Sequence, residues 1–288
     1  MPEGVGESVG TAPTGPLAGA VALCRPTNAL LAGLLPIVGA YVAGALVARP
    51  LAALVAGVAT AFGTAAGNAV NDYFDRDVDA VNAPGRPIPS GAIRPRDALV
   101  VATIAAAVAV VVTVAFLPVA ALALGLVNLV VLLAYTPWLK GRYGLGNVAV
   151  AYLGGSAFLF GGLAVGSLAG VAVMAGLAAS ATLARELLKD VEDAAGDETR
   201  DLSTLAVALG PARATALGDA CLVVTVLLSP LPYLTGTLGL TYLAIVAVAD
   251  VLGVAAIVRS GTDVRASQQF VKYAMAVSVV AFVAGRVP

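Results

Sequence analysis

Two acidic stretches of the sequence carry the same spacing of aspartates. The first reads NAVNDYFDRDVD (68–79) and the second reads ELLKDVEDAAGD (186–197). Each stretch places three aspartates at positions i, i+3 and i+7, and these are Asp72, Asp75 and Asp79 in the first and Asp190, Asp193 and Asp197 in the second. A spacing that occurs twice indicates one kind of site built from two parts of the chain, and the surrounding helices could form a parallel repeat.

If each stretch is helical, its three aspartates lie on one face, because positions i, i+3 and i+7 fall within about 60° of one another at about 100° per residue. Asn68 and Glu186, four residues earlier, join this face. Asp77 and Glu192 point away from it and are predicted to be ordinary solvated charges. Three like charges on one face repel one another, so a cation is expected between them.

Magnesium is the cation that this donor set favours. Mg²⁺ prefers hard oxygen ligands and is commonly held by one or two carboxylates together with the phosphates of a substrate. We therefore predict Mg²⁺ as the cofactor and all six aspartates as metal ligands around one diphosphate. Neither stretch has the spacing of a calcium-binding EF-hand loop.

Basic residues near the aspartates could stabilise the charge that develops on a departing diphosphate. Arg86 follows the first stretch in NAPGRPIPSG (82–91), Lys140 and Arg142 share a later loop, and Lys189 lies within the second stretch. We predict that these four residues contact the substrate, with membrane topology as the alternative explanation for each. The predicted catalytic residues are Asp75, Asp193, Arg86 and Lys140.

The elements that must position these residues are membrane helices. Of 288 residues, 60% are hydrophobic and only 11% are charged, and the mean hydropathy is +0.96, which excludes a soluble domain. The sequence predicts an all-α integral membrane bundle of nine transmembrane helices in a single domain (17–288), preceded by a disordered tail (1–16). The predicted spans lie near 27–47, 51–70, 98–116, 119–135, 147–166, 168–189, 212–231, 238–258 and 270–287.

The distribution of charge orients this bundle. All basic residues except Arg49 and Arg286 fall on one side of a nine-helix arrangement, and the positive-inside rule assigns that side to the cytoplasm. Both acidic stretches end spans that run toward the same side. We expect a multi-pass protein of the cell membrane, surrounded by lipids, with its active site on the cytoplasmic side. The net charge of −1 gives no reason to expect a nucleic-acid partner.

The sequence restricts the remaining chemistry. It contains no histidine, and its two cysteines, Cys24 and Cys221, form no CxxC pair, which argues against zinc, haem and disulfide sites. The commonest general base is therefore absent. Asp219 and Asp250 lie inside predicted spans, where a carboxylate is costly. A functional role and a hydrogen bond to a neighbouring helix are both open for them, and neither is assigned to the site.

The two stretches resemble the motifs of a known family. The first (71–79) is similar to the Asn-Asp-x-x-Asp-x-x-x-Asp hallmark of the UbiA-type membrane prenyltransferases, and the second (189–197) is similar to the aspartates on their sixth helix. RPIPSG (86–91) is also typical of them. Within the family, three segments look most like archaeal digeranylgeranylglyceryl phosphate synthases, namely CRPTN (24–28), LKGRYGLGNVAVAYLGG (139–155) and ARELLKDVEDAAGD (184–197).

This resemblance implies transfer of a geranylgeranyl group from a prenyl diphosphate, geranylgeranyl diphosphate, to the hydroxyl of a lipid acceptor, geranylgeranylglyceryl phosphate. Asn68 and Asn71 would be supporting polar ligands, and Arg86 and Lys140 would clamp phosphate. Arg25, at the start of the first span, would contact the acceptor phosphate or simply obey topology. No residue in the sequence identifies the base that removes the acceptor's proton.

Other functions stay open at this point. An aromatic acceptor of the hydroxybenzoate or naphthoate type, for quinone synthesis, would use the same donor chemistry. A cation transporter would use paired carboxylates within the membrane, but both stretches lie at helix ends and not at the midplane. A phosphatidyltransferase acting on CDP-alcohols is disfavoured, because its Asp-Gly-x-x-Ala-Arg run is missing.

Overall fold

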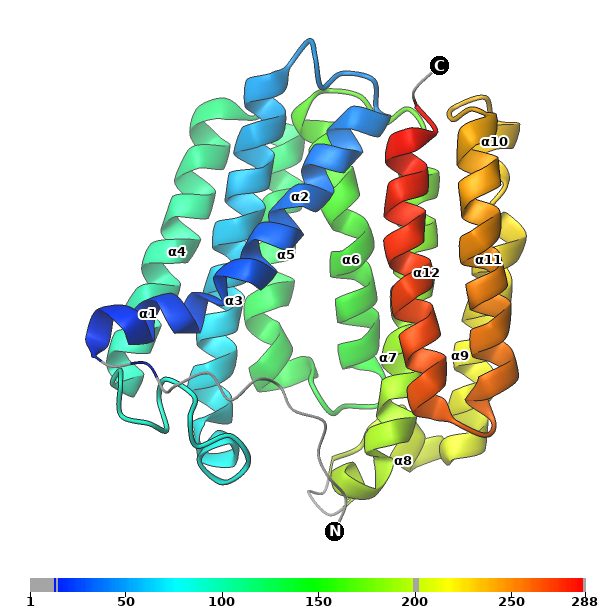
Figure 1. Ribbon diagram of the computed structural model, residues 1–288. Helices are drawn as coiled ribbons and strands as arrows, with labels where there is room; N and C mark the ends of the chain where they lie inside the picture. The colour runs from blue at the N-terminus through cyan, green and yellow to red at the C-terminus, as the bar shows by residue number, and fades with distance from the viewer. Residues whose placement is uncertain (1–12, 14, 199–201, 287–288) are drawn as a thin grey trace.

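The protein is a bundle of membrane helices. The computed structural model describes residues 13, 15–198 and 202–286, so the predicted tail at 1–16 lies almost wholly outside the described residues. Within those ranges, nine helical segments are long and apolar enough to cross a membrane, as the sequence predicts. They run up and down side by side, and the chain starts at the lower end of the bundle and finishes at the upper end (Figure 1).

Short turns connect successive spans, so most helices that follow one another in the chain run antiparallel. In chain order the elements are α1 (Pro16–Cys24), α2 (Pro26–Val42), α3 (Pro50–Asn82), α4 (Pro95–Phe116), α5 (Val119–Ala134), the π-helix η1 (Tyr135–Leu139), α6 (Leu145–Ala164), α7 (Val171–Glu198), α8 (Leu205–Leu209), α9 (Pro211–Leu228), α10 (Leu231–Leu234), α11 (Leu240–Ser260) and α12 (Val264–Ala284).

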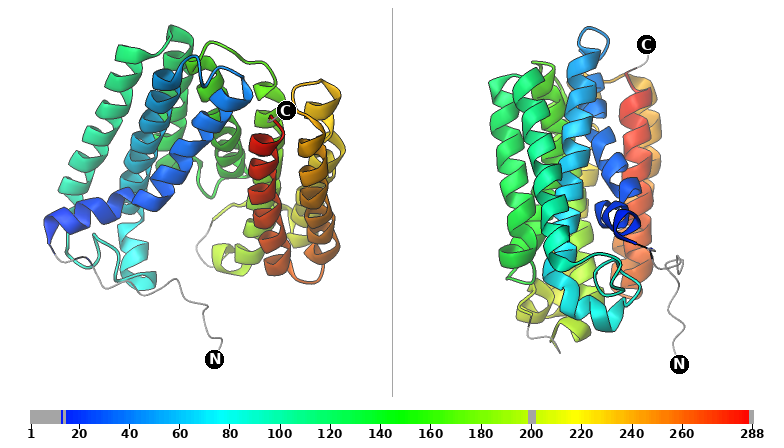
Figure 2. Two further views of the ribbon diagram at one scale, coloured as in Figure 1. Left: turned by 45° about the horizontal axis from the view of Figure 1, so that its top comes forward. Right: turned by 90° about the vertical axis from the view of Figure 1, so that its left-hand side faces the viewer.

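The first span differs from the predicted range of 27–47. It consists of α1 and α2, which are separated at Arg25, where the backbone adopts a left-handed φ of 45°. Pro26 explains the break, since proline restricts the residue before it and is well suited to start the next helix. At the other end the helix stops at Val42, close to Gly44 with φ 76°. Figures 1 and 2 show α2 running obliquely across the bundle, packed against α3 and α6.

Helices α3 and α7 are longer than a membrane crossing requires. They contain 33 and 28 residues, which correspond to about 50 and 42 Å at 1.5 Å per residue. A hydrocarbon layer of about 30 Å leaves the final turns of both helices at or beyond its edge. Both run toward the lower end of Figure 1, so the two aspartate stretches lie at the same end of the bundle on continuous helices.

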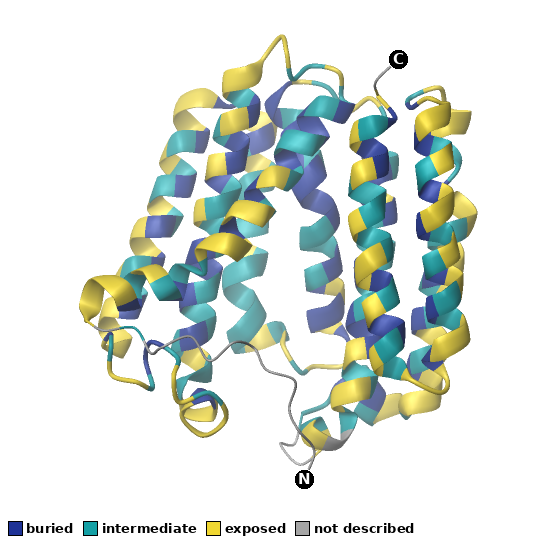
Figure 3. Ribbon diagram, in the orientation of Figure 1, coloured by how far each residue is buried: buried dark blue, intermediate teal, exposed yellow. Residues whose placement is uncertain are grey.

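The core of the bundle joins its two halves. Its largest buried cluster includes Val42, Phe158, Met174, Tyr242 and Phe282, which come from α2, α6, α7, α11 and α12. Large apolar side chains also cover the outside of the bundle, where exposed residues dominate the outward surfaces (Figure 3). An apolar exterior of this kind is what a lipid environment requires.

Two glycines set the distance between α2 and α6. A Cβ atom added at Gly161 would lie 1.8 Å from the carbonyl oxygen of Pro36, and one added at Gly39 would lie 2.3 Å from that of Phe158. Neither position can therefore hold a side chain unless the backbones separate. Such small-residue contacts allow close packing where lipid supplies no hydrophobic drive between helices.

We expect Gly161→Ala to lower the free energy of unfolding by about 1–3 kcal/mol, because the added methyl group collides with the α2 backbone. Gly176→Ala on α7 is the matched control, since a Cβ there meets no atom within 4 Å. The control is expected to raise stability by about 0.5–1 kcal/mol, the helix preference of alanine over glycine. Unfolding in detergent micelles measures both, and a stabilising Gly161→Ala would contradict the close crossing.

Candidate active site

Two buried carboxylates of α3 share two guanidinium groups. The Asp72 side chain is only 3% exposed and accepts a hydrogen bond from Arg25, at the break between α1 and α2, at 2.5 Å. Arg86, in the loop after α3, donates to Asp79 at 2.7 Å and lies 3.6 Å from Asp72. Burial alone would lower the pKa of Arg86, but the hydrogen bond from Arg86 to Asp79 and the charges of both aspartates raise it. The guanidinium therefore stays charged.

The remaining aspartate of the first stretch, Asp75, is more accessible than Asp72 and Asp79 and contacts the turn between α5 and α6. The Lys140 ammonium group, directly after η1, lies 2.7 Å from the Asp75 carboxylate. One turn earlier on α3, Asn71 donates to the hydroxyl of Thr136 in η1 at 3.1 Å. Short π-helical segments are frequent at functional sites. Here the segment presents a hydroxyl and then a lysine to the aspartate face of α3.

The second cluster lies at the end of α7. Asp190 is partly buried and accepts a hydrogen bond at 2.9 Å from Asn147, in the first turn of α6. Asp193 is exposed and Asp197 is partly buried. Lys189 and Arg142 are both exposed, and the backbone of Arg142 pairs with that of Ser203 in a single parallel bridge. Asn147 is not among the residues predicted for the site, since no local sequence pattern places it beside Asp190.

The π-helix η1 lies between the helices that carry the two clusters. It packs against α3 and against α6, whose Asn147 donates to Asp190 on α7. Among the described residues, no three acidic side chains converge closely enough to hold a metal ion by themselves. The predicted ligands therefore do not form an all-protein cage. An ion bound here would need further oxygen atoms, which fits the way Mg²⁺ combines one or two carboxylates with substrate phosphates.

Two residues that were predicted to be solvated differ in their contacts. Asp77 is 84% exposed with Arg76 at 3.6 Å, in agreement with the prediction. Glu192 is also exposed, in agreement with the prediction, and 29% of its side chain is accessible. Its carboxylate nevertheless accepts hydrogen bonds from Arg265 at 2.8 Å and from Gln268 at 2.6 Å, both on α12. These contacts join the face of α7 that points away from the aspartates to α12.

The structure gives partners for Arg25 and Asn68, and the roles expected for them stay predictions. Arg25 is expected to contact an acceptor phosphate or to reflect topology, and its guanidinium pairs with Asp72. Asn68 is expected to be a polar ligand, and its amide donates to the carbonyl of Cys24 at 3.2 Å. It therefore supports the helix break that positions Arg25. The sequence signal for this break is the pair Arg25-Pro26. The partner of Arg25 on α3, Asp72, could not be predicted from the local sequence.

The aspartates within the spans bond to neighbouring helices. Asp219 on α9 accepts from Ser260 on α11 at 2.9 Å, and Asp250 on α11 accepts from Ser229, at the end of α9, at 2.7 Å. These two contacts join the same pair of helices. Of the two roles left open for these residues, the interhelical hydrogen bond is the one present in the structure.

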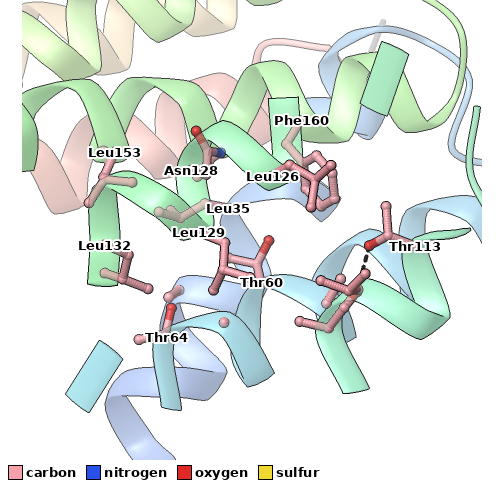
Figure 4. A pocket seen from close by; sticks show the side chains of 18 of the residues that line it. Leu35, Thr60, Thr64, Thr113, Leu126, Asn128, Leu129, Leu132, Leu153 and Phe160 are labelled. Atoms are coloured by element: carbon pink, nitrogen blue, oxygen red, sulfur yellow. Dashed lines mark hydrogen bonds between the residues drawn. The ribbon is translucent and has the colours of Figure 1, made fainter. Parts of the chain in front are cut away.

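An apolar chamber of about 380 Å³ adjoins the aspartate clusters on the membrane side. Thr64, on its wall, lies eight residues before Asp72, about 12 Å along α3. Figure 4 shows side chains that surround the chamber, including Leu35, Leu129, Leu132, Leu153 and Phe160, with Thr60, Thr64 and Asn128 as polar members. A ligand with its anionic head at the aspartates could place a hydrocarbon tail in this chamber.

Comparison with known proteins agrees with this arrangement. A model of the UbiA prenyltransferase family matches residues 33–280. The chain belongs to the UbiA prenyltransferase family. With nine apolar spans among its described residues, this UbiA-family chain is a multi-pass membrane prenyltransferase. The resemblance of its aspartate motifs to that family is confirmed.

Individual relatives of this UbiA-family chain are similar along nearly their whole length. The digeranylgeranylglyceryl phosphate synthase of Natronomonas pharaonis is 51% identical over 270 residues, covering 93% of this chain and 96% of the relative. A solved structure of a digeranylgeranylglyceryl phosphate synthase has a TM-score of 0.85 at 29% identity, covering 94% of this chain and 99% of the other. A UbiA homologue from Archaeoglobus fulgidus bound to GPP and Mg²⁺ shares the fold, with a TM-score of 0.62 at 18% identity over 90% of this chain and 99% of the other.

We expect a double-mutant cycle of Arg86→Gln and Asp79→Asn to give a coupling free energy of about 1–2 kcal/mol, because the pair is partly buried and joined by a charged hydrogen bond. The same cycle on Arg76 and Asp77, an exposed pair at 3.6 Å, is expected to give about 0–0.5 kcal/mol. Unfolding in detergent micelles gives both values. Equal couplings would contradict the burial of the Arg86 pair.

Proposed function

We propose that this UbiA-family enzyme transfers a geranylgeranyl group from geranylgeranyl diphosphate to geranylgeranylglyceryl phosphate in archaeal ether-lipid biosynthesis. The observation that carries the proposal is the 51% identity with the Natronomonas pharaonis synthase over 93% of this chain. The TM-score of 0.85 with a solved synthase supports it further. Both substrates have an anionic head and a long hydrocarbon tail, as the aspartate clusters and the adjoining chamber require.

The aspartates at the ends of α3 and α7 would hold Mg²⁺, directly or through water. Asp193 is exposed, and Asp75 is the most accessible of the three aspartates on α3, so these two are suited to direct contact. Asp72 and Asp79 lie behind Arg25 and Arg86, so they also orient those side chains. Mg²⁺ bound there would stabilise the negative charge that develops on the diphosphate. The binding of GPP and Mg²⁺ by the Archaeoglobus fulgidus homologue supports this assignment.

The basic side chains bind the diphosphate itself. Arg86 is fixed by Asp79 and Asp72, so its remaining N–H groups have a defined direction. The ammonium group of Lys140 forms an ion pair with Asp75, but the Lys140 side chain is 41% exposed. The ammonium group can therefore donate to a phosphate oxygen as well. Arg142 and Lys189 are exposed near the two clusters and contribute positive charge at the entrance. Asn71 holds η1 against α3 and so positions Lys140.

The reaction joins the acceptor hydroxyl to the first carbon of the donor tail. The bond from this carbon to the diphosphate oxygen breaks, and the diphosphate takes the bonding electrons. The largely apolar walls of the chamber would disfavour water beside the allylic carbon, so that the acceptor hydroxyl is the preferred nucleophile. Because the head and tail sites are about two helical turns apart on α3, the reacting carbon would lie at the boundary between them.

We further propose that the active site faces the cytoplasm and that residues 17–288 form a single domain. The basic residues of the loops support this orientation: Arg86 and Arg94 lie between α3 and α4, and Lys140 and Arg142 between η1 and α6, at the end of the bundle that carries the aspartates, whereas Arg49 lies between α2 and α3 at the other end. Helices from α2 to α7 line one chamber, which supports a single unit for the donor site.

An acceptor panel tests the function. Purified enzyme is given labelled geranylgeranyl diphosphate and Mg²⁺ with geranylgeranylglyceryl phosphate, a hydroxybenzoate or a naphthoate. We expect a labelled ether lipid from the first acceptor and a kcat/KM at least about 100-fold lower for either aromatic acceptor, since neither reproduces the polar head of the lipid. Prenylation of an aromatic acceptor alone would overturn the lipid assignment, and Mg²⁺ transport into vesicles without transfer would favour a transporter.

Substitution of the accessible aspartates tests the metal assignment. We expect Asp75→Ala and Asp193→Ala each to lower kcat by about 100-fold or more, because each removes a carboxylate that binds Mg²⁺. Asp77→Ala is the matched control on α3, since this aspartate points into solvent and is expected to leave the rate unchanged. Size-exclusion chromatography in detergent verifies folding. Wild-type turnover from Asp75→Ala or Asp193→Ala would refute the assignment.

A further inference from the structure

Neighbouring residues of α7, Arg185 and Glu186, form an ion pair that the donor site does not use. The guanidinium of Arg185 lies 2.8 Å from the carboxylate of Glu186, and their side chains are only 27% and 11% exposed. The Nε atom of Arg185 is buried and has no hydrogen-bond partner in the described part of the chain. A buried ion pair gains little stability, and an unpaired buried donor is costly. A role in binding would explain why the pair is present.

The position of Glu186 is between the two parts of the donor site. It precedes Asp190 by one helical turn on the same face of α7, about 6 Å along the axis. Thr182, one turn further into the membrane, lines the apolar chamber. Glu186 is therefore level with the boundary where the reacting carbon of the donor would lie.

We propose that Arg185 and Glu186 form the subsite for the glycerol phosphate head of the acceptor. Arg185 binds the phosphate, and Glu186 accepts a hydrogen bond from the reacting hydroxyl. This inference rests on the proposed function. The short glycerol backbone keeps the hydroxyl within a few bonds of the phosphate, so a cation and a carboxylate held side by side match the two groups. Arginine suits this role because its planar group can donate two parallel hydrogen bonds to phosphate.

Glu186 then supplies the base that the sequence does not reveal. As the acceptor oxygen bonds to the first carbon of the donor, the bond from that carbon to the diphosphate breaks, and the hydroxyl proton passes to a Glu186 carboxylate oxygen. The diphosphate oxygen keeps the electron pair of the bond that breaks, and the acceptor oxygen supplies the pair for the bond that forms. The proton leaves Glu186 for water after the product departs. A general base must lie within hydrogen-bond reach of its proton, and the level of Glu186 along α7 meets this condition.

The other basic residues of the site are less suited to the acceptor. Arg25 and Arg86 are bound to Asp72 and Asp79, and Lys140 to Asp75, so their charge serves the donor end of the site. Arg185 instead pairs with its sequence neighbour Glu186. Glu186 lies four residues before Asp190, the first aspartate of the second stretch. An acceptor that lacks phosphate would leave the Arg185 subsite unused. The pair would therefore select for the phosphorylated lipid.

The test compares geranylgeranylglyceryl phosphate with geranylgeranylglycerol, which lacks only the phosphate. We expect Arg185→Gln to raise the KM for the phosphorylated acceptor at least about 10-fold and to leave the donor KM unchanged. The phosphate preference, which is the ratio of kcat/KM for the phosphorylated acceptor to kcat/KM for the acceptor without phosphate, is therefore expected to fall. Glu186→Gln is expected to lower kcat by about 100-fold or more with both KM values near wild type, and Glu186→Asp to recover part of the rate.

The matched controls are Arg265→Gln and Glu192→Gln, which break another 2.8 Å ion pair of α7, on the side that faces α12. Both are expected to keep the wild-type phosphate preference and rate. Binding of a non-hydrolysable donor analogue with Mg²⁺ identifies folded protein, and the ratio between the two acceptors is independent of how much enzyme is folded. Arg185→Lys, which keeps the charge, serves as a second variant if Arg185→Gln does not fold, with an expected partial loss of the preference.

The outcomes separate the two proposals. An unchanged phosphate preference in folded Arg185→Gln or Arg185→Lys, or a wild-type kcat in Glu186→Gln, overturns the acceptor subsite while the proposed function stands. A wild-type enzyme that does not prenylate geranylgeranylglyceryl phosphate overturns the proposed function itself.

Discussion

The repulsion among carboxylates at the edge of an apolar layer is the constraint on which this site depends. Three aspartates on one face of α3 cannot remain ionised and close together without compensation, and burial of Asp72 makes the requirement stronger. The compensating cations come from three separate irregularities of the fold. Arg25 lies at the break between two helices, Arg86 in the loop after α3, and Lys140 directly after the π-helix η1. The departures from regular helix are therefore where positive charge enters the site.

The two aspartate stretches share a spacing but not an environment. On α3, guanidinium and ammonium groups compensate Asp72, Asp79 and Asp75. On α7, Asp190 is bonded to the neutral amide of Asn147, and Asp193 faces solvent. The α3 side can therefore present fixed positive charge to a diphosphate, while Asp190 and Asp193 on the α7 side, bound by a neutral amide and facing solvent respectively, are suited to a divalent cation. This difference between the two sides is consistent with a substrate that binds as a complex of metal and anion.

The parts of the structure that the sequence predicts are those set by local periodicity. Span number, helix continuity through both stretches and the shared face of the aspartates follow from apolar length and from the helical period. Partners across helices do not. The pairing of Arg25 with Asp72 and of Asn147 with Asp190 depends on how α2 slants over α3 and how α6 begins beside α7. The same tertiary dependence applies to Glu192, because its partners Arg265 and Gln268 could be identified only once α12 was placed.

Two glutamates of α7 illustrate how helix geometry assigns chemistry to one residue type. Glu186 and Glu192 are six residues apart, so they project about 120° away from one another. Each lies close to an arginine at 2.8 Å. Glu192 faces α12 and joins two helices through Arg265 and Gln268, which holds the end of α7 in place. Glu186 faces the boundary between the aspartates and the chamber. The buried Nε–H of its neighbour Arg185 has no hydrogen-bond partner among the described residues. The same pair of residue types therefore has a different environment on each of two faces of α7.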